Sequence, residues 1–204
     1  MKTKLFIDFD KTLFDTSQVK ERLVRIFSQL GFSQSEIEQT YIAEFLDGKF
    51  DPEGQAKRLC NIRPFNIEIA ELKIKSMIFD SNKLLYSDTI DFLDDINRKK
   101  YEVDLLSYGD EDFQTRKIKH SGIIDKFDNI YITNIEKQIY FKEIVKSDEY
   151  FIVIDDKGDT LEKISEKFPK SFMILIVRNI DNILKNENFK GTKVRNLKQA
   201  LEYL

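Results

Sequence analysis

The chain has 204 residues but only one cysteine and one histidine, and this scarcity excludes several kinds of site. With Cys60 alone no disulfide can form within the chain, and such a thiol is typically a small buried residue in a reducing cytoplasm. Soft metals such as zinc need clusters of Cys and His, and neither Cys60 nor His120 has a second residue of its type. We therefore expect no disulfide and no zinc-type site.

Glycine and proline are also scarce, with 7 and 3 residues, while hydrophobic residues make up 41% and charged residues 34%. This composition excludes low-complexity and disordered chains and indicates a globular protein. The longest apolar run, FMILIV at 172 to 177, is far shorter than a membrane span. Asp8 and Asp10 interrupt the opening MKTKLFIDFD before a signal-peptide core could form, so we expect a soluble cytoplasmic protein.

The sequence also lacks a large excess of charge of either sign, since 33 basic and 36 acidic side chains are mixed along it and leave a net charge of −3. A protein that depends on a polyanionic surface would carry a basic excess, so we expect no nucleic-acid partner. The length suits one core domain with a smaller insertion.

Short apolar runs indicate an α/β fold. Near-continuous Ile, Val, Leu and Phe, bounded by turn residues and alternating with helical segments, are typical of parallel strands buried on both faces. The runs are KLFIDFD, EVDLLSYGD, YFIVIDD and FMILIVRN, with a weaker one at NIYITN. We predict a Rossmann-like parallel sheet flanked by helices.

Residues 16 to 84 differ, because strand-like runs vanish and apolar residues follow helical spacing. One stripe ends at Gly31, and Ser33 with Glu36 forms a potential capping box for a second helix that ends before Gly48. Further helices are predicted within 52 to 62 and 66 to 79. We predict a small all-helical cap inserted after the first strand, and beyond it a helix capped by Ser87 and a closing helix in NLKQALEYL.

Polar residues end three of the predicted strands: Asp8 and Asp10, then Ser107, then Asp155 and Asp156. In parallel sheets the carboxyl ends of the strands meet at one edge, where ligands bind. Carboxylates gathered there repel each other unless they share a hard cation or one of them has a raised pKa. Oxygen ligands of this kind favour Mg²⁺.

These motifs resemble those of the haloacid dehalogenase-like (HAD) superfamily of phosphohydrolases, in order and over most of the chain. DFDKT at 8 to 12 resembles its first motif, DLLS ending at Ser107 its second, and VIDDKGDTLEKI its fourth. The third motif is a lone lysine, for which Lys137 is the better candidate and Lys142 the alternative. The resemblance implies a catalytic core of residues 1 to 15 and 85 to 204, with the cap at 16 to 84 acting as a lid.

The resemblance also implies roles for single residues. Asp8 would attack phosphorus and form an aspartyl-phosphate, while Asp10 would protonate the leaving oxygen and then accept a proton from water. Ser107, Lys137 and Thr12 would contact the phosphate. Magnesium would be held by Asp8, the backbone carbonyl of Asp10, Asp155 and Asp156.

Other positions near these motifs leave questions open. Lys11 stands where many relatives have glycine, and we interpret this position as tolerant. Asp159 is a possible supporting carboxylate, so the sequence does not decide which of Asp155, Asp156 and Asp159 contact the metal. Tyr108 and Gly109 lie beside the second motif and are expected to shape the phosphate pocket.

The sequence favours a magnesium-dependent phosphatase acting on a small phosphorylated metabolite. Asp10 argues against the carbon–halogen hydrolases of the superfamily, which the resemblance implies would lack an aspartate at this position. A phosphomutase of the same fold and a non-catalytic protein-binding member remain alternatives. Neither substrate identity nor oligomeric state follows from the sequence.

Overall fold

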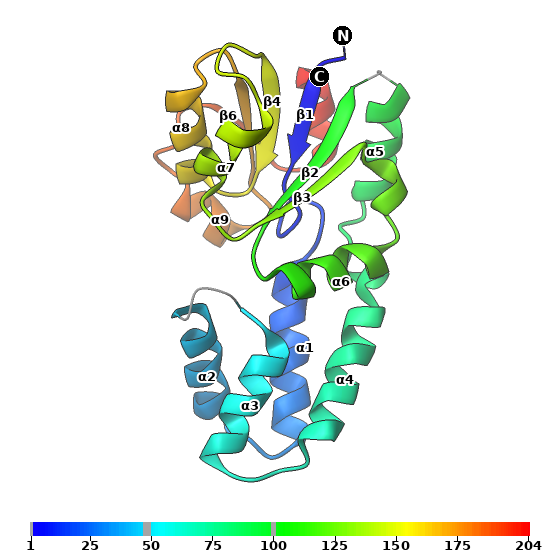
Figure 1. Cartoon of the computed structure of the whole chain (residues 1–204), viewed down its shortest axis with the longest axis vertical. Coiled ribbons are helices and arrows are strands. Elements are labelled where there is room, and N and C mark those ends of the chain that lie inside the picture. Colours follow the sequence, from blue (N-terminus) through cyan, green and yellow to red (C-terminus); the bar gives the residue numbers. More distant parts are fainter. Residues whose placement is uncertain (1, 47–49, 99–100) are drawn as a thin grey trace.

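The computed structural model describes residues 2–46, 50–98 and 101–204, and its centre is a parallel sheet (Figure 1). Six strands pair in the order β3-β2-β1-β4-β5-β6, and every pairing is parallel. The strands are β1 (Lys4–Ile7), β2 (Glu102–Tyr108), β3 (Asn129–Thr133), β4 (Phe151–Asp155), β5 (Phe172–Ile176) and β6 (Thr192–Val194). The predicted α/β class is confirmed. Strand β6 was not predicted, because its three residues carry only one buried side chain, Val194.

Both faces of the sheet are covered, as the near-continuous apolar strands predicted. Side chains alternate between faces, so Leu5 and Ile7 of β1 join one apolar cluster while Phe6 joins the other. The Phe6 face packs against Phe141 and Phe151, with ring centroids 4.9 and 5.7 Å away. The central strands are thus shielded from water on both sides.

The predicted helical insertion follows β1. It contains α1 (Thr16–Gln29), α2 (Gln34–Leu46), α3 (Pro52–Ile62) and α4 (Ile67–Phe79). Figure 1 shows these four helices as one group beyond the end of β1 that leads into α1. The short helix η1 (Ser81–Leu84) then leads back to α5 (Thr89–Arg98) and β2.

Local signals account for the ends of these helices. The capping box is confirmed: the backbone N–H of Ser33 donates to Glu36 at 2.7 Å, and the N–H of Glu36 donates to the Ser33 hydroxyl at 3.3 Å. Gly31 follows α1 with a φ of 88°, a conformation that favours glycine. The predicted end of the second helix at Gly48 lies outside the described residues.

The predicted cap of α5 was wrong, because the helix begins at Thr89 and not directly after Ser87. The carbonyl of Asp88 accepts the first helical hydrogen bond, from Phe92, so Asp88 occupies the capping position. Its carboxylate serves a tertiary contact, accepting from Arg178 at 3.0 and 2.8 Å. Arg178 also donates to the carbonyl of Thr12, at 3.2 Å from its Nε, and so ties together the two connections between sheet and insertion.

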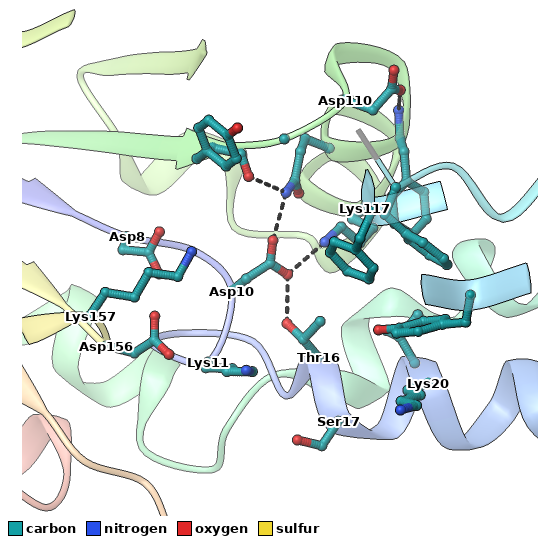
Figure 2. A pocket seen from close by; sticks show the side chains of 18 of the residues that line it. Asp8, Asp10, Lys11, Thr16, Ser17, Lys20, Asp110, Lys117, Asp156 and Lys157 are labelled. Atoms are coloured by element: carbon teal, nitrogen blue, oxygen red, sulfur yellow. Dashed lines mark hydrogen bonds and ion pairs between the residues drawn. The ribbon is translucent and has the colours of Figure 1, made fainter. Parts of the chain in front are cut away.

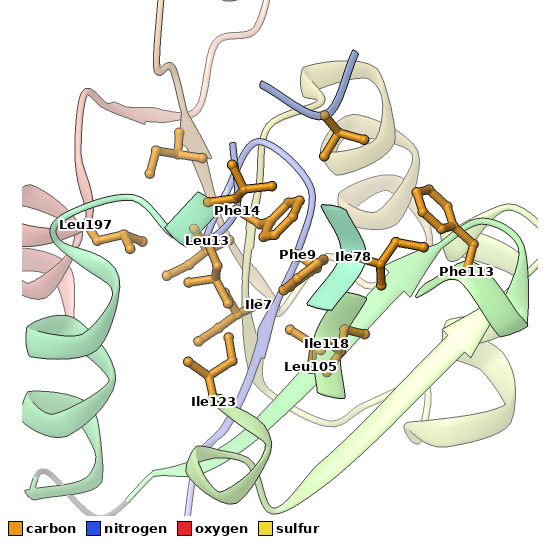
Figure 3. Close-up of a cluster of buried hydrophobic side chains, with 14 of the residues drawn as sticks. Ile7, Phe9, Leu13, Phe14, Ile78, Leu105, Phe113, Ile118, Ile123 and Leu197 are labelled. Carbon is orange, nitrogen blue, oxygen red and sulfur yellow. The ribbon is translucent and has the colours of Figure 1, made fainter. Parts of the chain in front are cut away.

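The larger apolar cluster runs from the sheet into the insertion. Figure 3 shows Ile7 and Leu105 of the sheet close to Phe9, Leu13 and Phe14 of the loop after β1, with Ile78 of α4 beside them. Phe9 and Phe14 stack with their centroids 4.7 Å apart. The loop that carries Asp8 and Asp10 is therefore anchored by its own aromatic residues.

Five further α-helices complete the described chain. They are α6 (Glu111–Ser121), α7 (Lys137–Ile144), α8 (Gly158–Lys167), α9 (Ile180–Lys185) and α10 (Leu197–Ala200), with short 3-10 helices η2 (Ile124–Lys126) and η3 (Leu201–Tyr203). The closing helix is confirmed as α10 followed by η3. Cys60 is partly exposed, contrary to the expected buried position. None of the described helices is long and apolar enough to span a membrane.

Candidate active site

The loop after β1 carries Asp8 and Asp10 just before a tight turn. The backbone N–H of Asp8 continues the sheet by donating to the carbonyl of Ile154 at 2.9 Å, and Asp8 is only 6% exposed. The turn closes when the N–H of Lys11 donates to the carbonyl of Phe14 at 2.7 Å. Lys11 has a φ of 60°, in the left-handed region that favours glycine. The interpretation of this position as tolerant was therefore wrong.

We expect Lys11→Gly to stabilise the protein by roughly 0.5–1 kcal/mol. The left-handed conformation costs a non-glycine residue roughly 1–2 kcal/mol, and the extra freedom of glycine in the unfolded chain offsets part of the gain. Urea unfolding would measure the change. Lys190→Gly, at an exposed loop position with an ordinary φ, is the control and should slightly destabilise the protein; an equal effect of both variants would contradict the strain argument.

Three carboxylates meet at the carboxyl ends of β1 and β4. Asp8, Asp155 and Asp156 are all buried, and each offers an oxygen within 4.8 Å of the others. Burial and the charges of Asp155 and Asp10 raise the pKa of Asp8 to about 6, although Lys137 opposes this shift. Burial and the charges of Asp8 and Asp155 raise the pKa of Asp156 to about 8. The cluster is strained when it is fully ionised.

Lys137 lies between two of these carboxylates. Its ammonium donates to Asp8 Oδ1 at 2.5 Å and to Asp155 Oδ2 at 2.7 Å. Burial lowers the pKa of Lys137, but the charges of Asp155 and Asp8 outweigh it and raise that pKa overall. Lys142, the alternative third-motif lysine, is exposed on the same helix. The structure thus brings Lys137, and not Lys142, to the acidic cluster.

The three carboxylates differ in how many of their oxygens accept hydrogen bonds from the described residues. Asp155 uses both of its oxygens, since the second accepts from the N–H of Lys157 at 2.9 Å. Asp8 Oδ2 is buried and has no hydrogen-bond partner among the described residues. The carboxylate of Asp156 accepts only a long bond of 3.4 Å, from Asn182, within the described part of the chain. Asp8 and Asp156 are therefore the carboxylates most open to a cation.

Asp10 is held by three donors that sequence reasoning missed. Thr16 and Lys117 each donate to Oδ1 at 2.6 Å, and Gln114 donates to Oδ2 at 2.6 Å. Figure 2 shows Asp10 between the Asp8 and Asp156 carboxylates and the Thr16 end of α1. Burial raises the pKa of Asp10, but the charge of Lys117 and these hydrogen bonds lower it overall. Its ionised form, which can accept a proton, is thus favoured.

Two of the predicted phosphate contacts are buried hydroxyls. Ser107, at the end of β2, and Thr12 are each 0% exposed, and neither hydroxyl has a partner among the described residues. Tyr108 and Gly109 line the cavity beside Ser107. A Cβ at Gly109 would lie 2.7 Å from the Gln114 nitrogen that binds Asp10, so a side chain there would displace Gln114 from Asp10.

A cavity of about 1060 Å³ connects this edge of the sheet to the helical insertion. The sheet side contributes Asp8, Asp10, Lys137 and Asp156, and the insertion contributes residues of α1 and α2 together with Phe50. Asp159 is exposed on α8 and does not belong to the described residues that line this cavity. The structure therefore brings the acidic cluster together without Asp159.

Comparison with known proteins decides the family. A family model described as haloacid dehalogenase-like hydrolase matches residues 5–142. The chain belongs to this family. The matched segment includes Asp8, Asp10, Ser107 and Lys137 but ends before Asp155 and Asp156, which the tertiary structure brings beside Asp8.

Solved structures of haloacid dehalogenase-like proteins share the whole fold. A protein from Burkholderia xenovorans LB400, classed as a haloacid dehalogenase-like hydrolase, has a TM-score of 0.79 at 18% identity, with 99% of each chain covered. The HAD-hydrolase YfnB from Bacillus subtilis, solved with bound magnesium, has a TM-score of 0.68 at 14% identity, covering 100% of this chain and 99% of that one.

L-2-haloacid dehalogenase from Xanthobacter autotrophicus has a TM-score of 0.63 at 14% identity, covering 99% of this chain and 98% of that one. No curated protein gives a significant sequence match. Because these identities are low, the structural similarities establish the fold and leave phosphatase and dehalogenase chemistry to be distinguished by the site itself.

The acidic cluster fits a hard divalent cation. The orphaned Asp8 Oδ2 and the raised pKa values of Asp8 and Asp156 indicate a cluster whose negative charge Lys137 does not fully balance. Oxygen ligands of this type match Mg²⁺. The donors therefore fit the metal that the sequence predicted, with Asp155 positioning Lys137.

We expect the metal-free protein to lose stability as pH rises from about 4 to about 8. The folded pKa of Asp156 is about 8 against 3.8 for the free side chain, so over this range the folded state binds more protons than the unfolded state. Asp156→Asn should therefore stabilise the metal-free protein at pH 8, by up to roughly 6 kcal/mol for a shift of about 4 pKa units at about 1.4 kcal/mol per unit.

Urea unfolding in the presence of a chelator would test this expectation. The gain should shrink toward pH 4, and Asp125→Asn, at an exposed carboxylate, should show no comparable pH dependence. Added Mg²⁺ should stabilise the wild type more than Asp156→Asn. A gain from Asp156→Asn that is equal at pH 4 and pH 8 would contradict the raised pKa.

Proposed function

We propose that this chain is a magnesium-dependent phosphatase that hydrolyses a small phosphomonoester through an aspartyl-phosphate. The observation that carries the proposal is Asp10, a second carboxylate held by three donors at 2.6 Å, two residues after the buried Asp8. Displacement of a halide produces no oxygen that needs a proton, so a dehalogenase has no use for an acid that protonates the leaving group.

In the proposed reaction one oxygen of the Asp8 carboxylate attacks phosphorus, and the bond from phosphorus to the leaving oxygen breaks. Asp10 gives a proton to that oxygen, so Asp10 must be protonated before this step. Breaking the ion pair between Asp10 and Lys117 would favour the protonated form of Asp10. Asp10 then takes a proton from a water molecule that attacks the aspartyl-phosphate, which frees phosphate and restores Asp8. The hydrogen bonds that hold ionised Asp10 support this second role.

The remaining side chains would bind and orient the phosphate. Lys137 would place its charge against the phosphoryl oxygens and keep Asp8 fixed. The Ser107 hydroxyl has no partner among the described residues, but it is buried outside the described cavity lining and would donate to a phosphoryl oxygen only after a local shift. Thr12 does not line the cavity among the described residues, and its proposed contact would use its buried hydroxyl only after a local shift. Asp8 and Asp156, with the backbone carbonyl of Asp10, would hold Mg²⁺, which supplies charge that screens the nucleophile from the phosphate.

The insertion at residues 16 to 84 would act as the lid of this site, and residues 1 to 15 and 85 to 204 would form the catalytic core. The proposed protein is cytoplasmic and acts without a nucleic-acid or membrane partner. The bidentate pair between Arg116 of α6 and Glu53 of α3, at 2.6 and 3.0 Å, supports a closed arrangement. A closed lid would exclude water from the aspartyl-phosphate until the leaving group departs.

Release of phosphate from acetyl phosphate and an aryl phosphate, with Mg²⁺ and with a chelator, tests the proposal. Metal-dependent release is expected. A phosphomutase would return an isomer of a sugar phosphate without free phosphate, which phosphorus NMR distinguishes. Tight Mg²⁺ binding with no turnover of any phosphoester would instead favour a non-catalytic binding protein.

A further inference from the structure

The leaving-group side of the site is walled by aromatic rings. Because Asp10 serves the leaving oxygen, the leaving group must extend past Asp10, away from Asp8. One of the three side chains that hold Asp10 is Lys117, which donates to it at 2.6 Å and lies 4.8 Å from the Phe113 ring centroid. Phe113 in turn contacts Phe50, with centroids 6.0 Å apart. Side-chain contacts therefore run without a break from the proton-transfer group into the insertion.

The wall ends in three rings that pack on one another. Phe50 lies 4.7 Å from Tyr41 and 5.1 Å from Phe45, and Tyr41 lies 5.0 Å from Phe45. All three line the cavity, yet Phe45 is 53% exposed. Contiguous exposed apolar side chains of this kind often mark a ligand-binding groove.

Polar groups stand at the far end of the wall. Lys20 of α1 lies 4.6 Å above the Tyr41 ring and pairs with Glu38 at 3.0 Å, and both line the cavity. Figure 2 shows Lys20 and Ser17 on α1, beyond Thr16 as seen from Asp8. A cation that donates and a carboxylate that accepts suit the heteroatoms at the edge of a planar ring.

We propose that the substrate is a phosphomonoester whose leaving group carries a planar heteroaromatic ring, which stacks on the Tyr41–Phe45–Phe50 wall with its polar edge toward Lys20 and Glu38. This inference rests on the proposed phosphatase function. The cavity volume of about 1060 Å³ suits such a leaving group, since a short phosphorylated acid would leave most of the wall bare. Nucleoside monophosphates and pyridoxal 5′-phosphate share this chemistry.

Matched esters test the inference. Uridine and adenosine 5′-monophosphates differ from ribose 5-phosphate only by the ring, and pyridoxal 5′-phosphate is compared with glycerol 3-phosphate. We expect kcat/KM for at least one ring-bearing ester to exceed its comparator by on the order of tenfold, the size of one ring stacking on an aromatic side chain. The ester with the higher kcat/KM shows whether the ring of the substrate is a nucleobase or a pyridine. Equal values within every pair would overturn the inference and leave the phosphatase proposal intact.

Substitution of the wall provides the second readout. Phe45→Leu should remove most of the ring-dependent gain, chiefly through a higher KM for the ring-bearing esters. The control is Phe79→Leu, because Phe79 is 69% exposed at the end of α4, away from the described lining of the cavity. A gain that survives Phe45→Leu would overturn the stacking site.

Binding separates this inference from the proposed reaction. The chain contains no tryptophan, so Phe45→Trp and Phe79→Trp each introduce a single fluorescent reporter. In the Asp8→Asn background, ring-bearing phosphates should quench the indole emission of the Phe45→Trp variant but not that of Phe79→Trp, and ribose 5-phosphate should quench neither. Quenching without turnover of any ester would support the ring-binding site and contradict the phosphatase proposal. Turnover without ring-dependent quenching would support the phosphatase proposal and contradict the ring-binding site.

Discussion

We expect Asp8→Asn to lose turnover by at least about 10⁴-fold while it keeps its fold, because the amide is nearly isosteric with the carboxylate but is a very poor nucleophile. Asp8 Oδ2 is the buried oxygen without a partner among the described residues, and Oδ1 is held by Lys137 at 2.5 Å. Both features suit a nucleophile that is oriented at one oxygen and open at the other.

Three measurements would check this expectation. Phosphate release gives the rate, circular dichroism gives the fold, and intact-mass spectrometry after acid quenching detects covalent phosphate in the wild type only. Asp125→Asn, at an exposed carboxylate away from the cavity lining, is the matched control and should retain activity. Activity of Asp8→Asn near the wild-type rate would remove Asp8 from the mechanism.

The largest expected loss of stability comes from Lys137→Met. This change leaves Asp8 and Asp155 buried without their shared cation, and breaking a buried ion pair in this way costs roughly 3–5 kcal/mol. Activity should also fall by on the order of 10²-fold or more, because the charge that would face the phosphate is lost.

The loss should depend on pH. Without Lys137 the folded pKa values of the carboxylates rise further, so protonation relieves the repulsion and the ionised cluster becomes costly. A raised folded pKa means that stability declines as pH increases, and the deficit of Lys137→Met should therefore be larger at pH 8 than at pH 5. Urea unfolding at both values, in chelator, would measure it.

Lys142→Met is the matched control, since Lys142 is exposed on the same helix. It should change the free energy of unfolding by less than about 0.5 kcal/mol. The same pair of variants decides between the two candidate lysines of the third motif: if Lys142→Met lost activity and Lys137→Met did not, the geometric assignment would fail.

Features governed by local chemistry were predictable from the sequence. The strands were visible because strands buried on both faces must be apolar throughout, as FIVID of β4 is. The Ser33–Glu36 capping box and the helix ends near it depend on residues three or four apart, so the sequence alone shows the required spacing. Strand β6 was not predicted because its three residues, TKV, are too few to show the apolar pattern of a buried strand.

The site was predictable to the extent that its residues end strands. Asp8, Ser107, Asp155 and Asp156 follow apolar runs, and parallel strands bring their carboxyl ends to one edge. Lys117 and Gln114 could not be found in the same way. They lie on α6 among other charged residues, and only the folded chain brings the Lys117 ammonium over the Phe9 and Phe14 rings and both side chains to Asp10.

The sequence by itself therefore determined the parallel sheet, the helical insertion and the acidic groups at the strand ends, because each follows from burial or from short-range hydrogen bonding. Tertiary structure alone decided that Lys137 and not Lys142 reaches the cluster, and that Asp155 is fully engaged while Asp156 is open. It also decided that Lys11 bears a left-handed φ. These outcomes depend on distances between groups up to 129 residues apart and on the closure of a turn, which residue identities and spacing do not contain.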